Sequence, residues 1–471
     1  MIRRWVWLFA IAVLVAGCNA TSVGVRKPAV GWVRSDLKPA TQPELAGGLL
    51  VLYVAAGGGL QVVGLDPKTG RSVWHDSASP GDIASGEPAA LGVAGSTVAF
   101  LSPVDNSTGS SRLVGVDAAT GRVLWRTPAE LFTDWPWPCA DDSLDICTTG
   151  FAPGQQTVAL RFRASDGRAV AAVPISLLPG AFGMAPGLYL PVFSPEMLAA
   201  VRGASIAWIR TLASVFPLPG VSTGYGWNLD EITAAGLYVG SVGAAPVAST
   251  SSATTYDLSR AMTAGFRISD GATVWRDPGT TYVCGVQLPC PGVDRTAVTY
   301  QAPTIGLRLR VTGTETVSRS PAPPILSPGA DVVVEGFSLA TGKTLWSYNA
   351  GRGYFSAHSL PLLGRYVAIV PAPGGSTAAL NLTTGARSPV PAGAVAWCLS
   401  YAVFKTQVGY AASRNGPLSY ERLTQEMIEP CHASGASVAV PRTVPGFVGT
   451  VVDGLTVWSE SSEVAAAPTS S

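Results

Sequence analysis

One stretch of this sequence, residues 113–126 (LVGVDAATGRVLWR), recurs in modified form along most of the chain. The stretch predicts two β-strands joined by a tight hairpin. Asp117 has a short carboxylate that can accept hydrogen bonds from backbone amides two residues on, and Gly121 can adopt the positive φ that a type I turn with a bulge requires. The return strand then begins at residues 123–125, which end in a tryptophan. A chain built from many such hairpins is restricted to β architectures.

Four copies of the stretch keep both the turn glycine and a tryptophan four residues after it. Neighbouring sheets of a β array have only side chains between them, so a tryptophan at the same point of each unit would set their spacing. A buried tryptophan removes roughly 150–250 Å² from water and contributes on the order of 4–6 kcal/mol before conformational entropy is subtracted. We assign a blade-docking role, with ligand stacking as the alternative, to four pairs: Gly70 and Trp74, Gly121 and Trp125, Gly271 and Trp275, and Gly342 and Trp346.

Repeats spaced by roughly 40 to 70 residues, each holding several short strands, are typical of radial β arrays. We therefore expect an all-β fold, a β-propeller with four-stranded blades, and eight blades, with seven as the alternative. The remaining copies that support this number are less complete: Gly167 and Gly385 without a tryptophan, and two weak candidates, Gly203 with Trp208 one residue too far away and Gly454 with Trp458.

The composition agrees with this class and argues against nucleic-acid binding. The 53 glycines and 37 prolines leave little room for long helices, and 47% hydrophobic residues can form a large core. The formal net charge is +1. Removal of a leader with Arg3 and Arg4 would leave 29 basic side chains (31 − 2) against 30 acidic ones. A chain so balanced has no field that steers nucleic acid toward it.

Residues 1–17 have the features of an export signal. Arg3 and Arg4 give a positive start, and an apolar run from Trp5 to Gly17 follows. This run is too short to span a bilayer core, which needs about 20 residues. The segment resembles a bacterial lipoprotein signal with the lipobox LVAGC. The resemblance implies that Cys18 is lipidated and becomes the mature N-terminus; an ordinary secretory peptide is the alternative.

The rest of the chain divides by composition. We expect a lipidated N-terminus with a flexible tether at residues 18–46, the propeller at 47–458, and a small, polar, disordered tail at 459–471. Ring closure would pair a strand near Leu49–Val54 with the last blade near Val451–Trp458, because closure removes free sheet edges. Residues 215–262 and 280–328 are the least repetitive and predict long loops of the kind that form binding surfaces.

Six cysteines follow Cys18, an even number that favours disulfides in an exported chain. Six thiols permit 15 connectivities, so the sequence leaves the pairing open. Zinc is the weaker alternative, since no C-x₂-C is present and His432 is the only imidazole near a cysteine. Proximity along the chain suggests three pairs: Cys139 with Cys147, Cys284 with Cys290, and Cys398 with Cys431.

The segment CADDSLDIC at residues 139–147 is rich in carboxylates. Asp141, Asp142 and Asp145, with Asp134 just before, could supply hard oxygen ligands for Ca²⁺, but the EF-hand spacing is absent. A solvated acidic loop is the favoured interpretation, and we predict no metal site.

Tests for catalytic motifs give nothing above background. Residues 220–224 (GVSTG) match the string G-x-S-x-G, but prolines precede them where a buried strand should lead in. The chain has only three histidines, His75, His358 and His432, and no phosphate-binding G-x-x-x-x-G-K-[ST]. We predict no catalytic and no cofactor-binding residues.

The repeated [LV]-D-x-x-T-G-x-x-x-W resembles the tryptophan-docking motif of the pyrroloquinoline quinone (PQQ)-like propeller family. Asp117, Thr120, Gly121 and Trp125 match it fully, and the copy at residues 62–75 matches as well. Other copies depart from it at the aspartate position, which is Arg163, Arg267, Ser338 and Asn381. The resemblance covers roughly residues 48–458 and implies the fold more specifically than any activity.

Two branches of that family have different functions. Quinoprotein dehydrogenases use a quinone stacked on a tryptophan, a Ca²⁺ held by carboxylate and amide groups and, in many members, a disulfide between adjacent cysteines. This chain has no adjacent cysteines. The other branch resembles the lipoprotein of the Bam outer-membrane assembly machinery, which is a cofactor-free docking scaffold. The lipobox favours this branch.

We therefore predict a lipid-anchored β-propeller at the bacterial cell envelope that is not an enzyme and binds a protein or peptide partner. It would be a monomer or part of a larger complex, without cofactor and without nucleic acid. A propeller that senses a carbohydrate or another small ligand is the alternative, and a dehydrogenase with PQQ and calcium is a more remote one.

Overall fold

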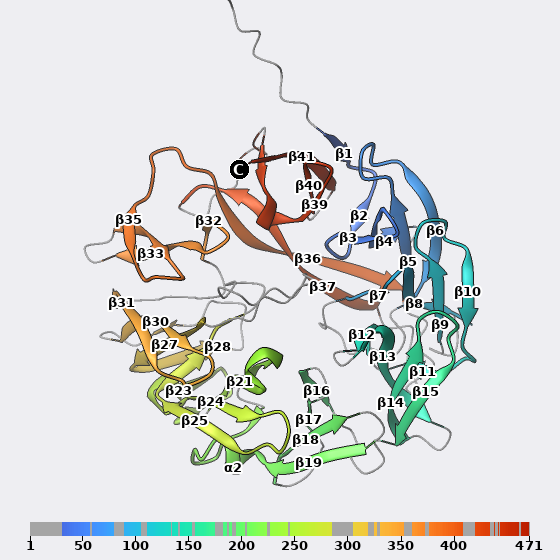
Figure 1. The fold of residues 1–471 in the computed structure, drawn as a ribbon. Coiled ribbons are helices and arrows are strands. Elements are labelled where there is room, and N and C mark those ends of the chain that lie inside the picture. The colour runs from blue at the N-terminus through green and yellow to red at the C-terminus, as the bar shows by residue number, and fades with distance from the viewer. Residues whose placement is uncertain are drawn as a thin grey trace, which may run out of the picture.

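The strands of the chain form a ring of antiparallel sheets in the computed structural model, which confirms the predicted all-β propeller fold (Figure 1). Along the chain the sheets follow one another clockwise in this view, from the blue N-terminal sheet to the red C-terminal one. No helix among the described residues is long and apolar enough to cross a membrane. The structure describes residues 31–470 apart from 57–58, 80–88, 105–110, 133, 140–141, 153–155, 175–181, 186–187, 191–194, 203–204, 224–226, 244, 285–304, 319–324, 327–329, 353–359, 373–375, 408–419, 434–437, 439–440, 442 and 461–462.

The first four blades are antiparallel meanders whose strands run from the inside of the ring outward. Blade 1 has β2 (Lys38–Pro39) and β3 (Glu44–Ala46) beside β4 (Leu49–Ala56), then β5 (Gly59–Leu65) and β6 (Ser72–Ala78). Blade 2 has β7 (Gly92–Ala94), β8 (Thr97–Pro103), β9 (Ser111–Asp117) and β10 (Val123–Arg126). Blade 3 has β11 (Leu131–Phe132) and β12 (Trp137–Cys139) beside β13 (Asp142–Ala152), then β14 (Gln156–Arg163) and β15 (Ala169–Pro174). Blade 4 has β16 (Phe182–Ala185), β17 (Leu188–Leu190), β18 (Met197–Arg202) and β19 (Ser205–Thr211).

The next three blades repeat the order and carry additions. Blade 5 has β20 (Trp227–Ile232), β21 (Leu237–Val242), β24 (Met262–Arg267) and β25 (Thr273–Pro278). Blade 6 has β26 (Thr280–Tyr282), β27 (Ile305–Thr312), β30 (Asp331–Ser338) and β31 (Thr344–Arg352). Blade 7 has β32 (Leu362–Gly364), β33 (Val367–Ala372), β34 (Ser376–Asn381) and β35 (Arg387–Pro389), with β36 (Ala396–Gln407) and β37 (Tyr420–Cys431) added at its inner edge.

The last blade joins both ends of the described chain. Short helical turns connect some strands: α2 (Leu212–Val215), η3 (Thr233–Ala235), η4 (Leu258–Arg260) and η6 (Gly446–Val448). Blade 8 has β39 (Thr450–Val452), β40 (Leu455–Ser459), β41 (Val464–Ser470) and, as its outer strand, β1 (Trp32–Arg34), while β38 (Val444–Pro445) pairs with the end of β41. The described residues thus hold eight meanders of the blade type and one further sheet of β22 (Ala248–Ser249), β23 (Ala253–Asp257), β28 (Thr314–Ser318) and β29 (Ile325–Leu326).

Strand direction defines two faces of the ring. In an antiparallel meander the turns between strands one and two and between strands three and four lie at one end of the blade. The D-x-x-T-G hairpins are turns of the second kind, so we call this end the turn face. The connections between strands two and three, and from one blade to the next, lie at the opposite end, which we call the insertion face. The β22–β23–β28–β29 sheet belongs to the insertion face, because its strands lie within second-to-third-strand connections of blades 5 and 6.

The predicted ring closure is wrong in its strands. The N-terminal partner of the last blade is β1, where Trp32 pairs with Ala466 and Arg34 with Val464. The expected strand near Leu49–Val54 is instead the second strand of blade 1. Closure uses β1 because blade 8 lacks an outer strand of its own, and the chain start supplies it.

Two of the expected domain boundaries are wrong, because residues expected in the tether and in the tail form strands of the ring. Residues 31–46 form β1, β2 and β3 and are not a flexible tether; residues 1–30, with the predicted leader and Cys18, lie outside the described part. The tail expected to be disordered contains β41, whose Val464 and Ala465 are at most 1% exposed. Small side chains suit this strand because it is packed between β1 and β40 inside the blade.

The predicted docking tryptophans each lie at a contact between consecutive blades. Trp74 of blade 1 covers the turn of blade 2, where a methyl group added at Gly121 (φ +69°) would lie 2.5 Å from the indole Cγ. The same indole donates a 2.8 Å hydrogen bond to Ala118 O. The equivalent bonds run from Trp125 to Ala164 O (2.6 Å), from Trp275 to Leu339 O (3.0 Å) and from Trp346 to Thr383 O (3.2 Å), beside Gly167, Gly342 and Gly385 respectively.

Two further tryptophans make the same contact. Trp208, a weak candidate by spacing, lies against Gly271 and donates to Ile268 O at 2.8 Å. Trp32, which the sequence analysis missed, lies against Gly70 and donates to Pro67 O at 2.8 Å. Within the described residues these contacts link blades 8, 1, 2 and 3 into one arc and blades 4, 5, 6 and 7 into another. The candidate at Gly454 and Trp458 makes a different contact, because Trp458 lies in β40, the second strand of its blade.

The disulfides follow the proximity prediction wherever both cysteines are described. Cys139 is bonded to Cys147 and Cys398 to Cys431, with Cα–Cα distances of 5.1 and 5.8 Å. Cys284 is also disulfide-bonded. Its predicted partner Cys290 lies outside the described residues.

Candidate partner-binding face

A long hairpin, β36–β37, distinguishes the insertion face. Its two strands have 12 residues each and are paired without a break from Ala396–Cys431 to Gln407–Tyr420. Ordinary strands have about five or six residues, so this hairpin extends well past the blade on which it begins. β36 is antiparallel to β32, which leads into a turn of the turn face. The hairpin therefore runs away from the turn face.

The base of the hairpin is held rigidly against two blades. The Cys398–Cys431 disulfide ties its two strands together, and Cys431 is 2% exposed. Trp397 pairs with Leu362 of blade 7 and packs edge-to-face on Trp458 of blade 8, with ring centroids 6.4 Å apart. Edge-to-face aromatic pairs are favourable beyond their buried area. The contact fastens the hairpin at the junction of blades 7 and 8.

From this base the hairpin crosses the middle of the ring. Figure 1 shows β36 and β37 running from blade 7 over the inside of the ring toward blades 1 and 2, and β36 contacts β5 of blade 1. Among the described strands, only β36 is paired with β37, so the outer edge of β37 carries a row of backbone N–H and C=O groups without a strand partner. Such an edge can accept an added strand from another chain.

The β22–β23–β28–β29 sheet is the second projection of the insertion face. The long loops predicted at residues 215–262 and 280–328 contribute it jointly, since β23 from the first pairs with β28 from the second. Its surface is polar: Thr255 and Thr316 exchange a 3.0 Å hydrogen bond, and Tyr256 lies opposite Glu315. Burial raises the pKa of Glu315. The sheet thus braces blades 5 and 6 against each other.

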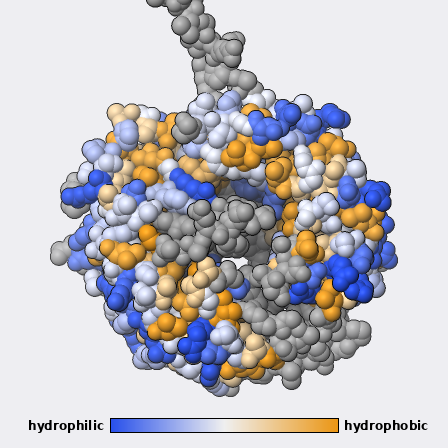
Figure 2. All heavy atoms as spheres, in the orientation of Figure 1, coloured by the Kyte–Doolittle hydropathy of each residue, from blue (hydrophilic) through white to orange (hydrophobic). Residues whose placement is uncertain are grey.

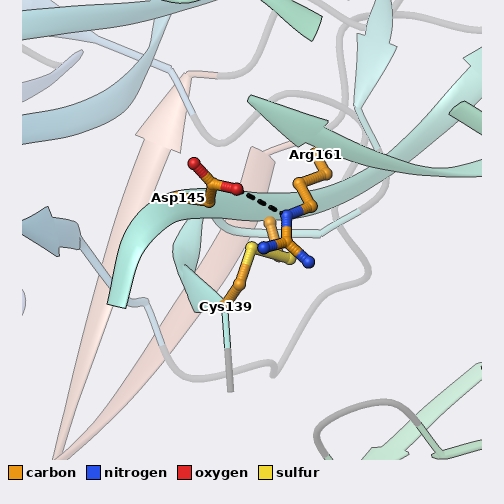
Figure 3. Close-up of a disulfide and its surroundings, with 4 residues drawn as sticks. Cys139, Asp145 and Arg161 are labelled. Carbon is orange, nitrogen blue, oxygen red and sulfur yellow. Dashed lines mark hydrogen bonds and ion pairs between the residues drawn. A yellow bond between two sulfur atoms is a disulfide. The ribbon is translucent and has the colours of Figure 1, made fainter. Parts of the chain in front are cut away.

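The acidic segment at residues 139–147 has a structural role where it is described. Asp145 is buried and accepts a 2.6 Å hydrogen bond from the guanidinium of Arg161, close to the Cys139–Cys147 disulfide (Figure 3). Asp141 lies outside the described residues. In the described part of the chain no three His, Cys, Asp or Glu side chains gather into a metal-binding group.

The serine of the G-x-S-x-G string is bonded to an acid. Ser222 donates a short hydrogen bond to Glu196, and Thr223 donates to the same carboxylate through its amide at 2.9 Å and its hydroxyl at 3.1 Å. A carboxylate that accepts three hydrogen bonds fastens this loop to blade 4. His75 is exposed on β6 and His432 is exposed beside the hairpin base, while His358 lies outside the described residues. The contacts of Ser222 and Thr223 with Glu196 are therefore those of a loop anchor.

The family resemblance raises the question of a quinone cofactor with calcium. Such a cofactor needs carboxylates that are available to coordinate the metal ion. Two buried carboxylates of the described residues already have hydrogen-bond donors. Asp230 accepts from the Tyr282 hydroxyl at 2.8 Å, and Glu335 accepts from Arg308 and Arg310 at 2.7 and 2.8 Å. Burial alone would raise the pKa of Glu335, but the hydrogen bonds from the two arginines lower it. These two carboxylates are therefore held by protein donors and not by a metal ion.

Comparison with known proteins agrees with the repeat assignment. Residues 19–132 match the family model described as outer membrane protein assembly factor BamB. The chain resembles this family of PQQ-like repeats over that segment. No match was found among curated proteins.

Solved structures that resemble the chain include three with low identity. BamB from Moraxella catarrhalis is 13% identical, with 74% of this chain and 81% of that chain covered and a TM-score of 0.32. A europium-containing methanol dehydrogenase is 12% identical, with 84% and 88% covered and a TM-score of 0.38. Sqt1 from Saccharomyces cerevisiae is 7% identical, with 93% and 98% covered and a TM-score of 0.42.

Proposed function

We propose that this protein is an exported, lipid-anchored scaffold of the bacterial cell envelope that binds a protein partner through its insertion face and performs no catalysis. The observation that carries the proposal is the β36–β37 hairpin, fastened by Cys398–Cys431 and extended across the ring. Extending an ordered hairpin over a propeller face costs conformational entropy. This cost is explained if the hairpin is a docking element, because such an element must keep its shape to bind a partner.

Three further observations support the proposal. The match at residues 19–132 is to a model named after an outer-membrane assembly factor. The sequence at residues 1–18 resembles a lipoprotein signal, and the disulfides at Cys139–Cys147 and Cys398–Cys431 suit an oxidising compartment outside the cytoplasm. Two buried carboxylates, Asp230 and Glu335, are bonded to tyrosine and to arginine, so neither is available to a metal cofactor.

Site-specific photo-crosslinking in the native envelope tests the partner-binding role. A photoreactive residue replaces Lys405 or Arg422, which are paired in the hairpin, and Lys343 on the turn face serves as the matched control position. We expect a discrete protein adduct from the two hairpin positions and none from position 343. Replacing residues 401–426 by Asn-Gly keeps the paired flanks Ser400 and Met427 and the disulfide, and should abolish the same partner's co-purification.

The opposite pattern would contradict the proposal. Equal adducts at all three positions, or co-purification that survives loss of the hairpin, would place partner binding elsewhere. The dehydrogenase alternative is tested separately by adding PQQ and Ca²⁺ to the purified protein. We expect no rise in Tm and no dye-linked alcohol oxidation. A rise in Tm would show that the protein binds the cofactor, and alcohol oxidation would make it an enzyme.

A further inference from the structure

The position of β1 shows from which face of the ring the chain enters its first described strand. Trp32, the first residue of β1, packs on Gly70 and donates its hydrogen bond to Pro67 O. Both belong to the hairpin of blade 1 on the turn face. The chain therefore enters blade 8 from the turn face, at the rim of the ring (Figure 1).

A lipid on Cys18 would hold this side of the molecule near the bilayer. Twelve residues, 19–30, lie between Cys18 and Gly31, so thirteen Cα–Cα steps (31 − 18) join the two. An extended segment of that length spans at most roughly 45 Å, since each residue adds about 3.3–3.6 Å. The inference that follows rests on the lipid anchor of the proposed function.

The turn face near this entry point carries a repeated cation. The residue directly after the turn glycine is Arg71, Arg122 and Arg168 in blades 1, 2 and 3, and Lys343 in blade 6. All four side chains are exposed, and among the described residues none of them forms an ion pair. The carboxylate of Asp66, in contrast, accepts three hydrogen bonds from its own turn, from the amides of residues 68 and 69 and the Thr69 hydroxyl.

In blades 1, 3 and 6 an exposed aliphatic side chain lies two residues beyond the cation: Val73 (41% exposed), Val170 (45%) and Leu345 (55%). Each occupies the extra position of a β-bulge, where the outer strand has one residue more than its partner. The equivalent Leu124 of blade 2 is half-buried. Single exposed aliphatic residues are common, but here the same position recurs beside the cation of three blades.

Three acidic residues lie close together on the insertion face: Glu429 at the base of the hairpin, and Glu460 and Glu463 in the neighbouring connection of blade 8. Burial, followed by the charges of Glu463 and Glu429, raises the pKa of Glu460. An anionic surface would attract the exposed arginines of the turn face and would not attract this acidic cluster.

We propose that the turn face of blades 1 to 3, through Arg71, Arg122 and Arg168, lies against anionic lipid headgroups of the membrane that holds the Cys18 lipid. The bulge aliphatic residues Val73 and Val170 reach toward the boundary between headgroups and acyl chains, where apolar side chains next to cations are favoured. The hairpin of the insertion face then lies on the side away from the membrane, open to its partner.

Hydrogen exchange on the reconstituted protein tests this orientation. The full chain, processed by its host, is placed in phosphatidylcholine vesicles with and without phosphatidylglycerol, and exchange is followed at the turns 66–71, 117–122 and 163–168. We expect phosphatidylglycerol to slow exchange there about fivefold or more, since one cation near an anionic surface changes binding about fivefold. The triple variant Arg71→Ser, Arg122→Ser, Arg168→Ser should lose this protection, and so should the native protein in high salt.

A matched variant changes cations of the other face, Lys38→Ser with Arg260→Ser, and should keep the protection. Turn amides that exchange equally in both kinds of vesicle would overturn the orientation while leaving the anchor intact. Protection that appears only after envelope proteins are added would assign the turn face to a protein and also overturn it. A processed chain that does not float with vesicles at all would refute the lipid anchor, and the orientation with it.

Discussion

At the scale of single residues, the docking contact explains why glycine and tryptophan recur together. Gly121 is required for two reasons: its φ of +69° is unfavourable for other residues, and the Trp74 indole occupies the space that a side chain would need. The repeat could be read from the sequence because the turn glycine and the tryptophan four residues after it belong to one hairpin. The partner of each tryptophan could not be read, since the ring covers the turn of the next blade.

Gly121→Ala should destabilise the protein by about 2–4 kcal/mol, which combines the cost of a positive φ with overpacking against Trp74. Gly95→Ala is the matched control, because Gly95 also has a positive φ (+60°) but no atom within 4 Å of an added methyl group. We expect the control to cost only about 1 kcal/mol. Chemical denaturation of both variants measures the difference, and equal costs would mean that the indole does not occupy the turn.

Glu44 provides a residue-scale prediction about pH. Burial raises its pKa from 4.5 to about 7. The folded state therefore holds a proton between these values that the unfolded state has released, so stability falls as pH rises from 4.5 to 7 and the loss is complete above 7. Glu44→Gln should remove this slope and stabilise the protein by up to about 3 kcal/mol at pH 8, with no effect at pH 4.

Asp270→Asn is the control for that titration. Hydrogen bonds from Arg267 lower the pKa of the exposed Asp270 to about 2, so its small stabilising effect is lost as pH falls toward that value. The two variants should thus change the pH profile of Tm in opposite directions. A Glu44→Gln profile that runs parallel to the native one would show that this carboxyl is solvated.

At the scale of elements, the sequence predicts the strands that repeat and fails for those that occur once. The hairpin β36–β37 lacks the glycine motif, and only the cysteines at its base gave a signal. β1 has three residues and pairs with β41, more than 400 positions away. No local pattern marks such a strand, because its energy comes from the sheet that it completes.

The hairpin disulfide should stabilise its element more than the whole protein. A closed loop of this length, with a sequence separation of 33, gives an entropic stabilisation of about 3–4 kcal/mol. Replacing Cys398 and Cys431 together by alanine should speed proteolysis within residues 396–431 while leaving global Tm nearly unchanged. The equivalent change at Cys139 and Cys147, which are part of blade 3, serves as the comparison. Uniform destabilisation by the hairpin change would contradict an independent element.

At the scale of the whole molecule, the ring separates two tasks. Three tryptophan contacts join blades 8, 1, 2 and 3, and three others join blades 4 to 7, so packing between blades is repeated and local. Other contacts cross from blade 7 to blade 8, through Trp397 and Trp458. The faces stay free for other roles: hairpins of cationic and aliphatic residues on one, long insertions on the other.

The closed ring and the orientation of the turn face toward the membrane both depend on where β1 lies, so the most direct test is a covalent link across ring closure. Val33 is paired with Ala465 in the closing sheet. Cysteines introduced by Val33→Cys and Ala465→Cys should form a disulfide during export, visible as faster migration on a non-reducing gel, and should raise Tm. Val33→Cys combined with Val451→Cys on the inner strand β39 should not link. Two free thiols in the first variant, or a link in the second, would contradict the closed ring.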